Sequence, residues 1–583
     1  MQNIQKYVVP LLRKALVAFV LLQLCWIVTA GFALALWYGT YVALKRADVG
    51  YATNLQRASW PMYQVSHRIY RLARLPLAWV RLSDYSDRGM RIITSINTLA
   101  SAGTRTATIV NENIPILLKK EKSAGDVILL RDSIKTLKKT LPKIDEQLLI
   151  LNVDLPHPDI QNARSYTSVL SALVSESDNI LGATSPKRYL LLFLNNKELR
   201  PGGGFIGSYA IANVQYYTIN TIEIHDVYEA DGQLKYHIEP HPAVRAYLGN
   251  PDGFLRDSNF SPDFPQNADT AREYLKASLK EEGFDGVVGV TTTALEELVG
   301  AWGSLRLPDY KETITKNNIY QKTQENVEKD FFPGSQRKRS FLTSLADTMR
   351  VTIDLVDRDK LMHALDVSLR QKHIVLNFES EQIQEAVEAQ SWGGKQSEAT
   401  FDYIMPVEAN VGVNKVNFHV KRRLDMALEM DGRTIKRRAK ITYDNKPRKG
   451  QDTKDTYRNY LQIFLPPNVR VTKAFIGKDR ASEPNDFATQ DDPRGYKVAT
   501  MIVEVPPNKT ETITIEYESK EYEKHKKGDR YKYDLLIQKQ VGLEQMEVVL
   551  DMKLPGGARD VQSDSPTSFS LLKDTTYSTS YRL

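Results

Sequence analysis

The chain has 583 residues, of which 42% are hydrophobic and 26% are charged, and its formal net charge is +7. This length predicts several domains, and the mild basic excess suits an anionic membrane surface or glycopolymer rather than nucleic acid. The single cysteine, Cys25, excludes an intrachain disulfide and a cysteine-ligated zinc site, and the lack of disulfides at this size favours a bacterial protein.

An uncharged run from Ala15 to Leu44 is the first predicted element. A spanning helix needs about 20 apolar residues, so this run is long enough to cross a bilayer with some tilt. We therefore interpret residues 1–14 as a cytoplasmic tail and 15–44 as a transmembrane signal-anchor in a bacterial plasma membrane, with the body extracytoplasmic. Cleavage after Ala33-Leu34-Ala35 is the alternative, although the apolar run continues well past it.

A helical stalk is predicted over residues 45–183, because glycine and proline are sparse and apolar residues recur at helical spacing. Steps of three and four are clearest in Val127, Leu130, Ile134, Leu137, Leu141, Ile144, Leu148 and Leu151. Such a heptad is typical of a bundle or coiled coil. We expect Pro142 to kink or divide this helix.

Residues 184–396 alternate between strand and helix patterns, which predicts an α/β head domain. Strands are expected at 189–194, 205–214, 221–227, 284–290 and 373–378. Helices are expected at 268–279, 294–302, 340–356, 359–369 and 381–390.

Residues 397–583 read as short strands separated by turn signals, which predicts an all-β, sandwich-like domain. The expected strands are 417–430, 437–443, 460–465, 500–505, 512–517, 533–538 and 547–554. Lys421-Arg422-Arg423 and the cations from Arg433 to Lys440 mark two neighbouring strands. We interpret this basic run as a solvated face, with contact to an anionic envelope polymer as the alternative.

A glycine cluster follows the first strand of the α/β domain, in Asn195-Asn196-Lys197-Glu198-Leu199-Arg200-Pro201-Gly202-Gly203-Gly204-Phe205. Glycines allow close approach to an anionic ligand, and an arginine can bind phosphate bidentately. We predict that Arg200 and Glu198 are catalytic. The predicted ligand-binding residues are Asn195, Asn196, Gly202, Gly203 and Gly204. The alternative is a hairpin turn braced by the Glu–Arg pair.

A second polar constellation spans Arg256 to Phe264. We predict that Asp257 and Asp263 ligate Mg²⁺ through oxygen, and that Arg256 and Asn259 bind the ligand. Helix capping beside an exposed loop is the alternative, because Asp and Ser are common caps.

Several stretches resemble a bacterial family of membrane-anchored domains of unknown function, with the signature N-N-x-E-L-R-x-x-G-G-F. The resemblance rests on Arg188 to Tyr209, Asp257 to Phe264, Phe284 to Val290, Lys372 to Ile374, Trp392 to Gly394 and Ala409 to Lys415. The core of that family is distantly similar to the LytR–CpsA–Psr phosphotransferases. Those enzymes move glycopolymers from polyprenyl-pyrophosphate lipids to the cell wall, using arginines and magnesium-binding aspartates.

The resemblance implies an α/β head like that of LytR–CpsA–Psr, Mg²⁺ as cofactor, and a polyprenyl-pyrophosphate-linked glycan or cell-wall polymer as partner. Where those enzymes carry Ser-x-Pro-Arg-Asp, this chain has Ile224-His225-Asp226-Val227 and lacks the arginine. Two functions therefore stay open. The protein binds or transfers a lipid-linked glycopolymer, as a phosphotransferase if it is an enzyme, or it is a non-catalytic envelope scaffold or adhesion protein. A short tail disfavours a sensor.

Overall fold

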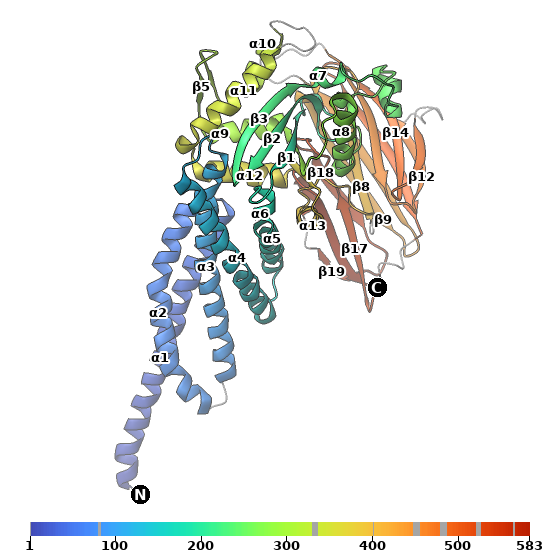
Figure 1. Cartoon of the computed structure of the whole chain (residues 1–583). Helices are drawn as coiled ribbons and strands as arrows, with labels where there is room; N and C mark the ends of the chain where they lie inside the picture. The colour runs from blue at the N-terminus through green and yellow to red at the C-terminus, as the bar shows by residue number, and fades with distance from the viewer. Residues whose placement is uncertain are drawn as a thin grey trace. The chain divides into compact units, whose positions relative to one another are not determined.

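The computed structural model describes residues 2–79, 83–328, 336–399, 402–446, 455–477, 487–520, 526–563 and 566–583. The chain forms two compact units, and its elements are labelled in Figure 1. The first unit comprises Met1–Pro186, Val214–Asn220 and Met349–Ala364. The second comprises Lys187–Asn213, Thr221–Thr348 and Leu365–Leu583. The expectation of a multidomain chain with a helical N-terminal region is confirmed.

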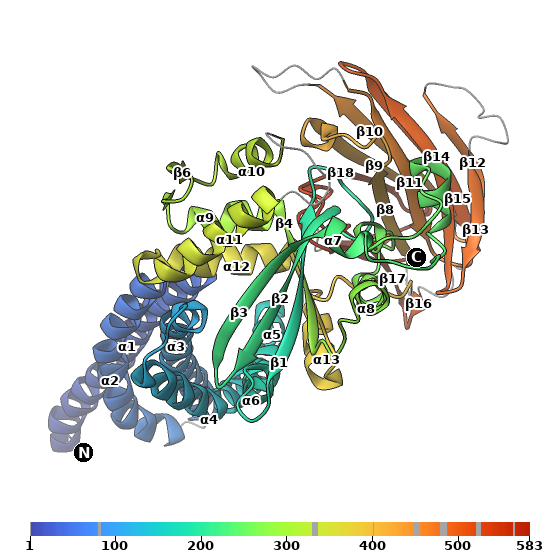
Figure 2. The same cartoon turned by 45° about the horizontal axis from the view of Figure 1, so that its top comes forward.

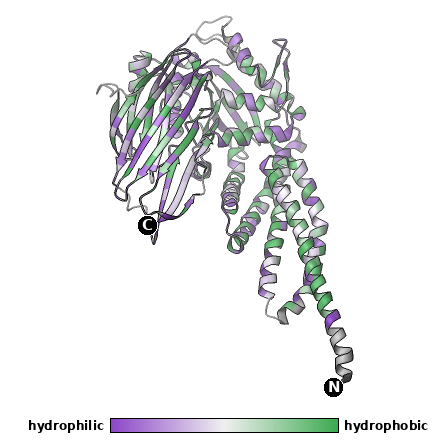
Figure 3. Ribbon diagram, turned by 180° about the vertical axis from the view of Figure 1, so that it is seen from behind, coloured by the Kyte–Doolittle hydropathy of each residue, from purple (hydrophilic) through white to green (hydrophobic). Residues whose placement is uncertain are grey.

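The first helix, α1 (Gln2–Lys45), contains the predicted anchor. Its portion Arg13–Lys45 is long and apolar enough to cross a membrane, and Figure 3 shows hydrophobic residues along most of it. Large apolar side chains, among them Leu24 and Phe32, are exposed on its surface. An apolar helix near the N-terminus is therefore confirmed, whereas its topology stays a prediction.

Helix α2 (Val49–Trp79) runs antiparallel along α1, and α3 (Ser83–Leu118) completes a bundle with them. The side-chain amide of Gln23 donates to the carbonyl of Ala73 at 3.0 Å. Nearer the turn, the rings of Trp37 and Tyr63 lie 6.0 Å apart. Because low numbers in α1 meet high numbers in α2, the pairing covers α1 from about Gln23 onwards.

Three further helices complete the helical region: α4 (Ala124–Asp154), α5 (Pro158–Ser175) and the short α6 (Ser177–Ile180). The predicted heptad lies on α4, where Leu130, Leu137, Leu141, Ile144, Leu148 and Leu151 are buried. They pack against apolar residues of α3 and α5. The helix continues through Pro142, so the expected division is wrong, whereas the alternative of a kink stays a prediction. Pro142 lies on the exposed face, where water can satisfy the carbonyl group that the proline leaves without a donor.

Shortening one side chain of this buried stripe should destabilise the helical unit. Leu141 is 2% exposed, so we expect Leu141→Ala to lower the free energy of unfolding by about 2–5 kcal/mol through lost burial and a cavity. Denaturant unfolding followed by circular dichroism measures the loss. Leu149→Ala on the same helix is the control, because Leu149 is 46% exposed. Equal losses in both variants would contradict the packing described.

A five-stranded sheet in the order β3-β2-β1-β4-β7 forms the centre of the α/β domain. Its strands are β1 (Lys187–Asn195), β2 (Phe205–Gln215), β3 (Thr218–Asp226), β4 (Gly286–Thr291) and β7 (Ile374–Phe378). β1 and β4 are parallel, whereas β4 and β7 are antiparallel. All five expected strands are therefore present, and the carboxyl ends of β1 and β4 lie at the same edge.

Helices α8 (Phe264–Leu279) and α13 (Glu381–Ala389) lie beside this sheet in Figure 2. The α-helices of residues 227–389 are α7 (Val227–Asp231), α8 (Phe264–Leu279), α9 (Thr292–Gly300), α10 (Ile319–Glu328), α11 (Gln336–Val351), α12 (Arg358–Arg370) and α13 (Glu381–Ala389). The short elements are η1 (Val244–Leu248), η2 (Leu255–Asp257), η3 (Ile353–Leu355), β5 (Leu305–Leu307) and β6 (Glu312–Ile314).

The C-terminal part contains a six-stranded and an eight-stranded sheet, in the orders β12-β15-β10-β9-β18-β20 and β13-β14-β11-β8-β17-β21-β19, with β16 beside β17. The strands are β8 (Asp402–Asn410), β9 (Val420–Met430), β10 (Ile435–Asn445), β11 (Tyr457–Leu465), β12 (Arg470–Ile476), β13 (Ala488–Asp492), β14 (Tyr496–Val505), β15 (Thr510–Ser519), β16 (Lys526–Lys527), β17 (Arg530–Ile537), β18 (Glu547–Lys553), β19 (Arg559–Ser563), β20 (Ser568–Ser570) and β21 (Thr575–Arg582). The helix η4 (Val416–Phe418) precedes β9.

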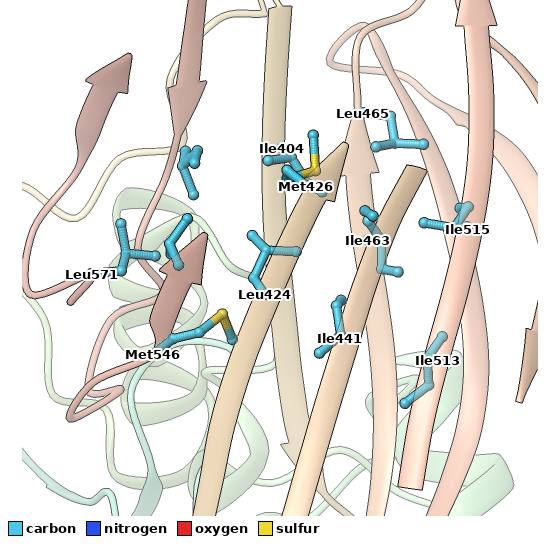
Figure 4. Close-up of a cluster of buried hydrophobic side chains, with 14 of the residues drawn as sticks. Ile404, Leu424, Met426, Ile441, Ile463, Leu465, Ile513, Ile515, Met546 and Leu571 are labelled. Atoms are coloured by element: carbon cyan, nitrogen blue, oxygen red, sulfur yellow. The ribbon is translucent and has the colours of Figure 1, made fainter. Parts of the chain in front are cut away.

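The two sheets share one hydrophobic core, which Figure 4 shows in close-up. Ile404 and Ile463 belong to the eight-stranded sheet, and Leu424, Ile441 and Ile513 belong to the six-stranded sheet. Because side chains alternate across a strand, each sheet supplies one apolar face to this core. The predicted strands of the C-terminal part are all present, and the arrangement is that of a β-sandwich.

The basic run of β9 and β10 does not form a wholly solvated face, so that prediction is wrong in part. Arg422 and Arg437 point inwards and are buried. The guanidinium group of Arg422 donates to Glu408 at 2.7 and 2.9 Å, and that of Arg437 donates to Asp402. An isolated buried charge is costly, so these two carboxylates of β8 are what allow the arginines to be buried.

Candidate functional site

The loop at residues 196–204, here called the clasp loop, begins where β1 ends, as expected for a site at the end of a strand. Its Leu199 is 1% exposed and belongs to the core of the β-sandwich. The backbone N–H of Leu199 donates to the side chain of Asn417 at 3.2 Å. Its carbonyl accepts from the backbone of Asn410 at 2.9 Å. The clasp loop therefore fixes the α/β domain to the sandwich.

A residue of the sandwich is in turn inserted into the α/β domain. Val541, which follows β17, belongs to the core of the α/β domain. The next residue, Gly542, donates its N–H to the carbonyl of Lys372 at 3.1 Å and accepts from the side chain of Asn196 at 2.9 Å. Each domain thus contributes one apolar residue to the core of the other, and the two form one compact unit.

The three glycines of the clasp loop pack against protein, which corrects their predicted role in ligand binding. A Cβ atom at Gly202 would lie 2.2 Å from the side chain of Asn267, and one at Gly204 would lie 2.4 Å from the carbonyl carbon of Asn195. Gly203, at φ +121°, contacts Val541. The glycines do allow a close approach to the backbone, as predicted, but the group that approaches is another segment of the protein and not a ligand.

This packing predicts a sharp response at Gly542. A Cβ atom there would lie 2.1 Å from the carbonyl oxygen of Gly203, and the backbone has φ +75°. We expect Gly542→Ala to lower the free energy of unfolding by about 2 kcal/mol or more, through strain and overpacking. Calorimetry of the full chain measures the effect. Gly556→Ala is the control because open space surrounds Gly556, and similar stability of both variants would contradict the clasp.

Arg200 belongs to the clasp loop, and it is 2% exposed. Its guanidinium donates to Glu198 at 2.8 Å and to the carbonyl of Asn410 at 2.5 Å. These contacts match the alternative prediction, in which the Glu–Arg pair braces the loop. The guanidinium group of Arg200, predicted to be catalytic, is therefore bonded to other protein groups. Glu198, in contrast, lines a cavity.

That cavity has a volume of about 240 Å³ and opens at the carboxyl ends of β1 and β4, the usual ligand position of open α/β sheets. Its residues come from the sheet, from α7, α9, α10 and α11, and from the segment before β9. They are Phe193, Leu194, Asn195, Glu198, Phe205, Gly207, Ser208, Asp226, Tyr228, Val290, Thr291, Thr292, Leu295, Ile319, Tyr320, Thr323, Gln324, Leu342 and Lys415. Of the predicted residues, Asn195 and Glu198 therefore line the cavity.

Burial shapes the electrostatics of the cavity. Burial raises the pKa of Glu198, while the neighbouring charges of Arg200 and Lys415 oppose that rise. Burial also raises the pKa of Tyr228, which lines the same cavity. A carboxyl group with a perturbed pKa in a cleft is a candidate for ligand binding or proton transfer. Among the predicted site residues, Glu198 is therefore the best candidate for ligand binding or proton transfer.

The residues of the second predicted polar constellation, Arg256 to Phe264, do not form one site, because they have different partners in the structure. Asp257 is buried and accepts a hydrogen bond from the side chain of Asn250 at 3.1 Å. Burial raises the pKa of Asp257, and the positive charges of Arg256 and Arg200 oppose that rise. Arg256 pairs with Asp231 at 2.7 Å. The side chain of Asn259 donates to the backbone of the clasp loop. These residues therefore connect η2 to the clasp loop within protein.

Asp263 has different neighbours. Its carboxylate accepts from the backbone N–H of Gln396 at 2.8 Å, and its cationic neighbours are Arg494 and Lys395. Over the ranges that the structure describes, no group of three or more His, Cys, Asp or Glu side chains is placed to hold a metal. Since Asp257 and Asp263 have separate partners, the residues present do not fit the shared Mg²⁺ site that the sequence suggested.

Sequence reasoning missed several cavity residues. Asp226 is the last residue of β3 and Tyr228 follows it, and Thr292 follows the end of β4. The rule that placed the clasp loop at a strand end, applied to these strands as well, would have found them. Lys415 comes from a segment 120 or more residues away from the sheet strands that line the cavity, so the motif of Ala409 to Lys415 marks the residue but does not place it at this site.

The buried Asp231 predicts a pH dependence. Burial raises its pKa from 3.8 to about 6 despite the pairing with Arg256. The folded protein then holds this proton more tightly than the unfolded chain, so stability falls as pH rises from about 4 to about 6. Replacing it by Asp231→Asn should reduce that slope by up to ~1.4 kcal/mol per pH unit. Denaturant melts at several pH values test this, and identical slopes would contradict it.

Comparison with known proteins adds one match. Residues 184–327 match a family described as "Protein of unknown function (DUF4012)", and this stretch includes the clasp loop and the Arg256 to Phe264 constellation. The resemblance to a domain of unknown function is thus supported, and the similarity to LytR–CpsA–Psr stays a prediction. No curated protein matches the chain.

Among solved structures, one match is a Legionella pneumophila subsp. pneumophila strain Philadelphia 1 protein, provisionally described as a nutrient binding protein. It is 9% identical, and the alignment covers 28% of this chain and 67% of that chain. The TM-score of 0.18 is too low to support an argument about fold or function.

Proposed function

We propose that this protein is a membrane-anchored binding protein of the bacterial cell envelope, with its body extracytoplasmic. Its cavity would hold the sugar and the first apolar units of a lipid-linked glycan. The cavity at the carboxyl ends of β1 and β4 carries this proposal. The apolar α1 supports it by keeping such a cavity near lipid-borne ligands.

The cavity lining suits an amphiphilic ligand. Seven apolar side chains line it, namely Phe193, Leu194, Phe205, Val290, Leu295, Ile319 and Leu342. Between them stand hydroxyl, amide and carboxyl groups that can bind sugar hydroxyls, including those of Ser208, Thr292 and Glu198. A volume of about 240 Å³ would accommodate part of such a ligand, with the remainder outside.

Binding is favoured over phosphate transfer. Transfer from a pyrophosphate requires cations that neutralise the developing charge. Lys415 is the cation among the described lining residues, and its charge acts on the carboxyl group of Glu198. The guanidinium of Arg200 is engaged by protein. We therefore assign Glu198 to ligand binding and Arg200 to positioning it.

Filling the cavity tests the proposal. We expect the full chain, extracted in mild detergent, to retain a glycolipid that mass spectrometry detects. Leu295→Trp should reduce that lipid at least about tenfold by occupying the cavity, whereas the volume-conserving Leu295→Met should retain it. Absence of lipid above that of a membrane blank in the wild-type protein would favour the scaffold function instead.

A further inference from the structure

A groove of about 370 Å³ lies within the first compact unit, along one face of α4. Its lining comes from α4, from α6 and from the turn between β2 and β3. The lining residues are Ile128, Arg131, Asp132, Ile134, Lys135, Lys138, Asp178 and Tyr217. The groove thus combines cations, apolar side chains and one aromatic ring, and it is separate from the cavity of the α/β domain.

The charges of the groove are only partly compensated. Lys138 pairs with Asp178 at 2.8 Å, and the hydroxyl of Tyr217 donates to the same carboxylate at 2.6 Å. These bonds lower the pKa of Asp178, so this carboxyl stays ionised and holds Lys138. Within the described ranges neither Arg131 nor Lys135 forms a salt bridge, although Arg131 interacts with the hydroxyl of Tyr217 and its charge acts on Asp178. Three cations against Asp132 and Asp178 leave one net positive charge in the groove.

The turn beside the groove is strained. Tyr216 and Tyr217 connect β2 to β3 with φ of +51° and +63°, a left-handed turn for which Asn-Gly is the relaxed sequence. Their backbone N–H groups donate to the carbonyls of Gly182 and Leu181, at 2.8 Å each, which holds the turn in place. Strained residues that the surroundings hold in place mark sites where the side chains are needed.

We infer that this groove binds an anionic sugar, with its acidic group at Arg131 and Lys135 and its ring against Tyr217. Guanidinium and ammonium groups bind phosphate or carboxylate through charge-assisted hydrogen bonds. An aromatic face and the side chains of Ile128 and Ile134 suit the C–H faces of a sugar ring. This inference is independent of the cavity and of its proposed ligand.

Calorimetric titration of the full chain, in nanodiscs of neutral phosphatidylcholine, tests the inference with glucose 6-phosphate as the probe. We expect the double variant Arg131→Ala, Lys135→Ala to weaken binding at least about tenfold. The matched control Lys139→Ala, Lys143→Ala removes two exposed cations of the same helix outside the groove and should bind as wild type.

Two further probes separate the sugar from the ion. Glucose alone should bind more weakly than glucose 6-phosphate, and so should inorganic phosphate. Equal affinity for inorganic phosphate and the sugar phosphate would overturn the inference in favour of an ion site. Equal weakening by the groove variant and the control would overturn it as well, as would a wild-type Kd for the sugar phosphate above about 1 mM.

The strain gives an independent test. The double variant Tyr216→Asn, Tyr217→Gly supplies the relaxed turn sequence, so we expect a higher Tm together with weaker binding of glucose 6-phosphate. A lower Tm would show that the tyrosines serve packing. Unchanged binding would show that the ring of Tyr217 is not part of the site.

Discussion

The exchange of Leu199 and Val541 is the interaction on which the rest of the second compact unit depends. Each residue is buried in the core of the domain that does not contain its own strand. Because of this exchange, adjacent residues of the clasp loop lie in different surroundings. Leu199 enters the sandwich, Arg200 braces the carbonyl of Asn410, and Glu198 is left facing the cavity. The chemistry available at the strand end is thus a consequence of how the domains are joined.

The stretches that carry the family resemblance meet at this junction. The backbone N–H of Phe264 donates to Gly394 at 3.1 Å, and that of Gly202 donates to Asn259 at 2.9 Å. Gly542 contacts Lys372, and Asn410 contacts the clasp loop. Glycine and asparagine residues that cluster in a motif are often interpreted as a ligand site. Here they satisfy buried backbone groups where two domains meet, which is an equally strict requirement.

Local patterns predicted most of the fold, since alternation and helical periodicity depend on neighbours in sequence. They failed for β8, where Asp402, Pro406 and Glu408 look unlike a buried strand. Their burial depends on Arg437 and Arg422, which come from other strands. The position of the candidate site was predicted from a strand end, but its glycines were assigned to a ligand. A glycine signals close approach and does not say what approaches, and Val541 lies more than 300 residues away.

The pairing of α1 with α2 has a consequence for the bilayer. Residues Ala33 and Trp37 of α1 are buried in the bundle, and the hydrogen bond from Gln23 places the partly exposed Arg74 of α2 beside the apolar run. An arginine at the bilayer centre costs roughly 2.5–3.5 kcal/mol, so insertion of α2 beside α1 into the hydrocarbon would be unfavourable. Were α1 to cross a bilayer, lipid and the bundle would compete for the face of α1 that carries Ala33 and Trp37. Its depth of insertion would then depend on the balance between contact with lipid and contact with α2, and a thicker membrane would shift that balance towards separation of the two helices.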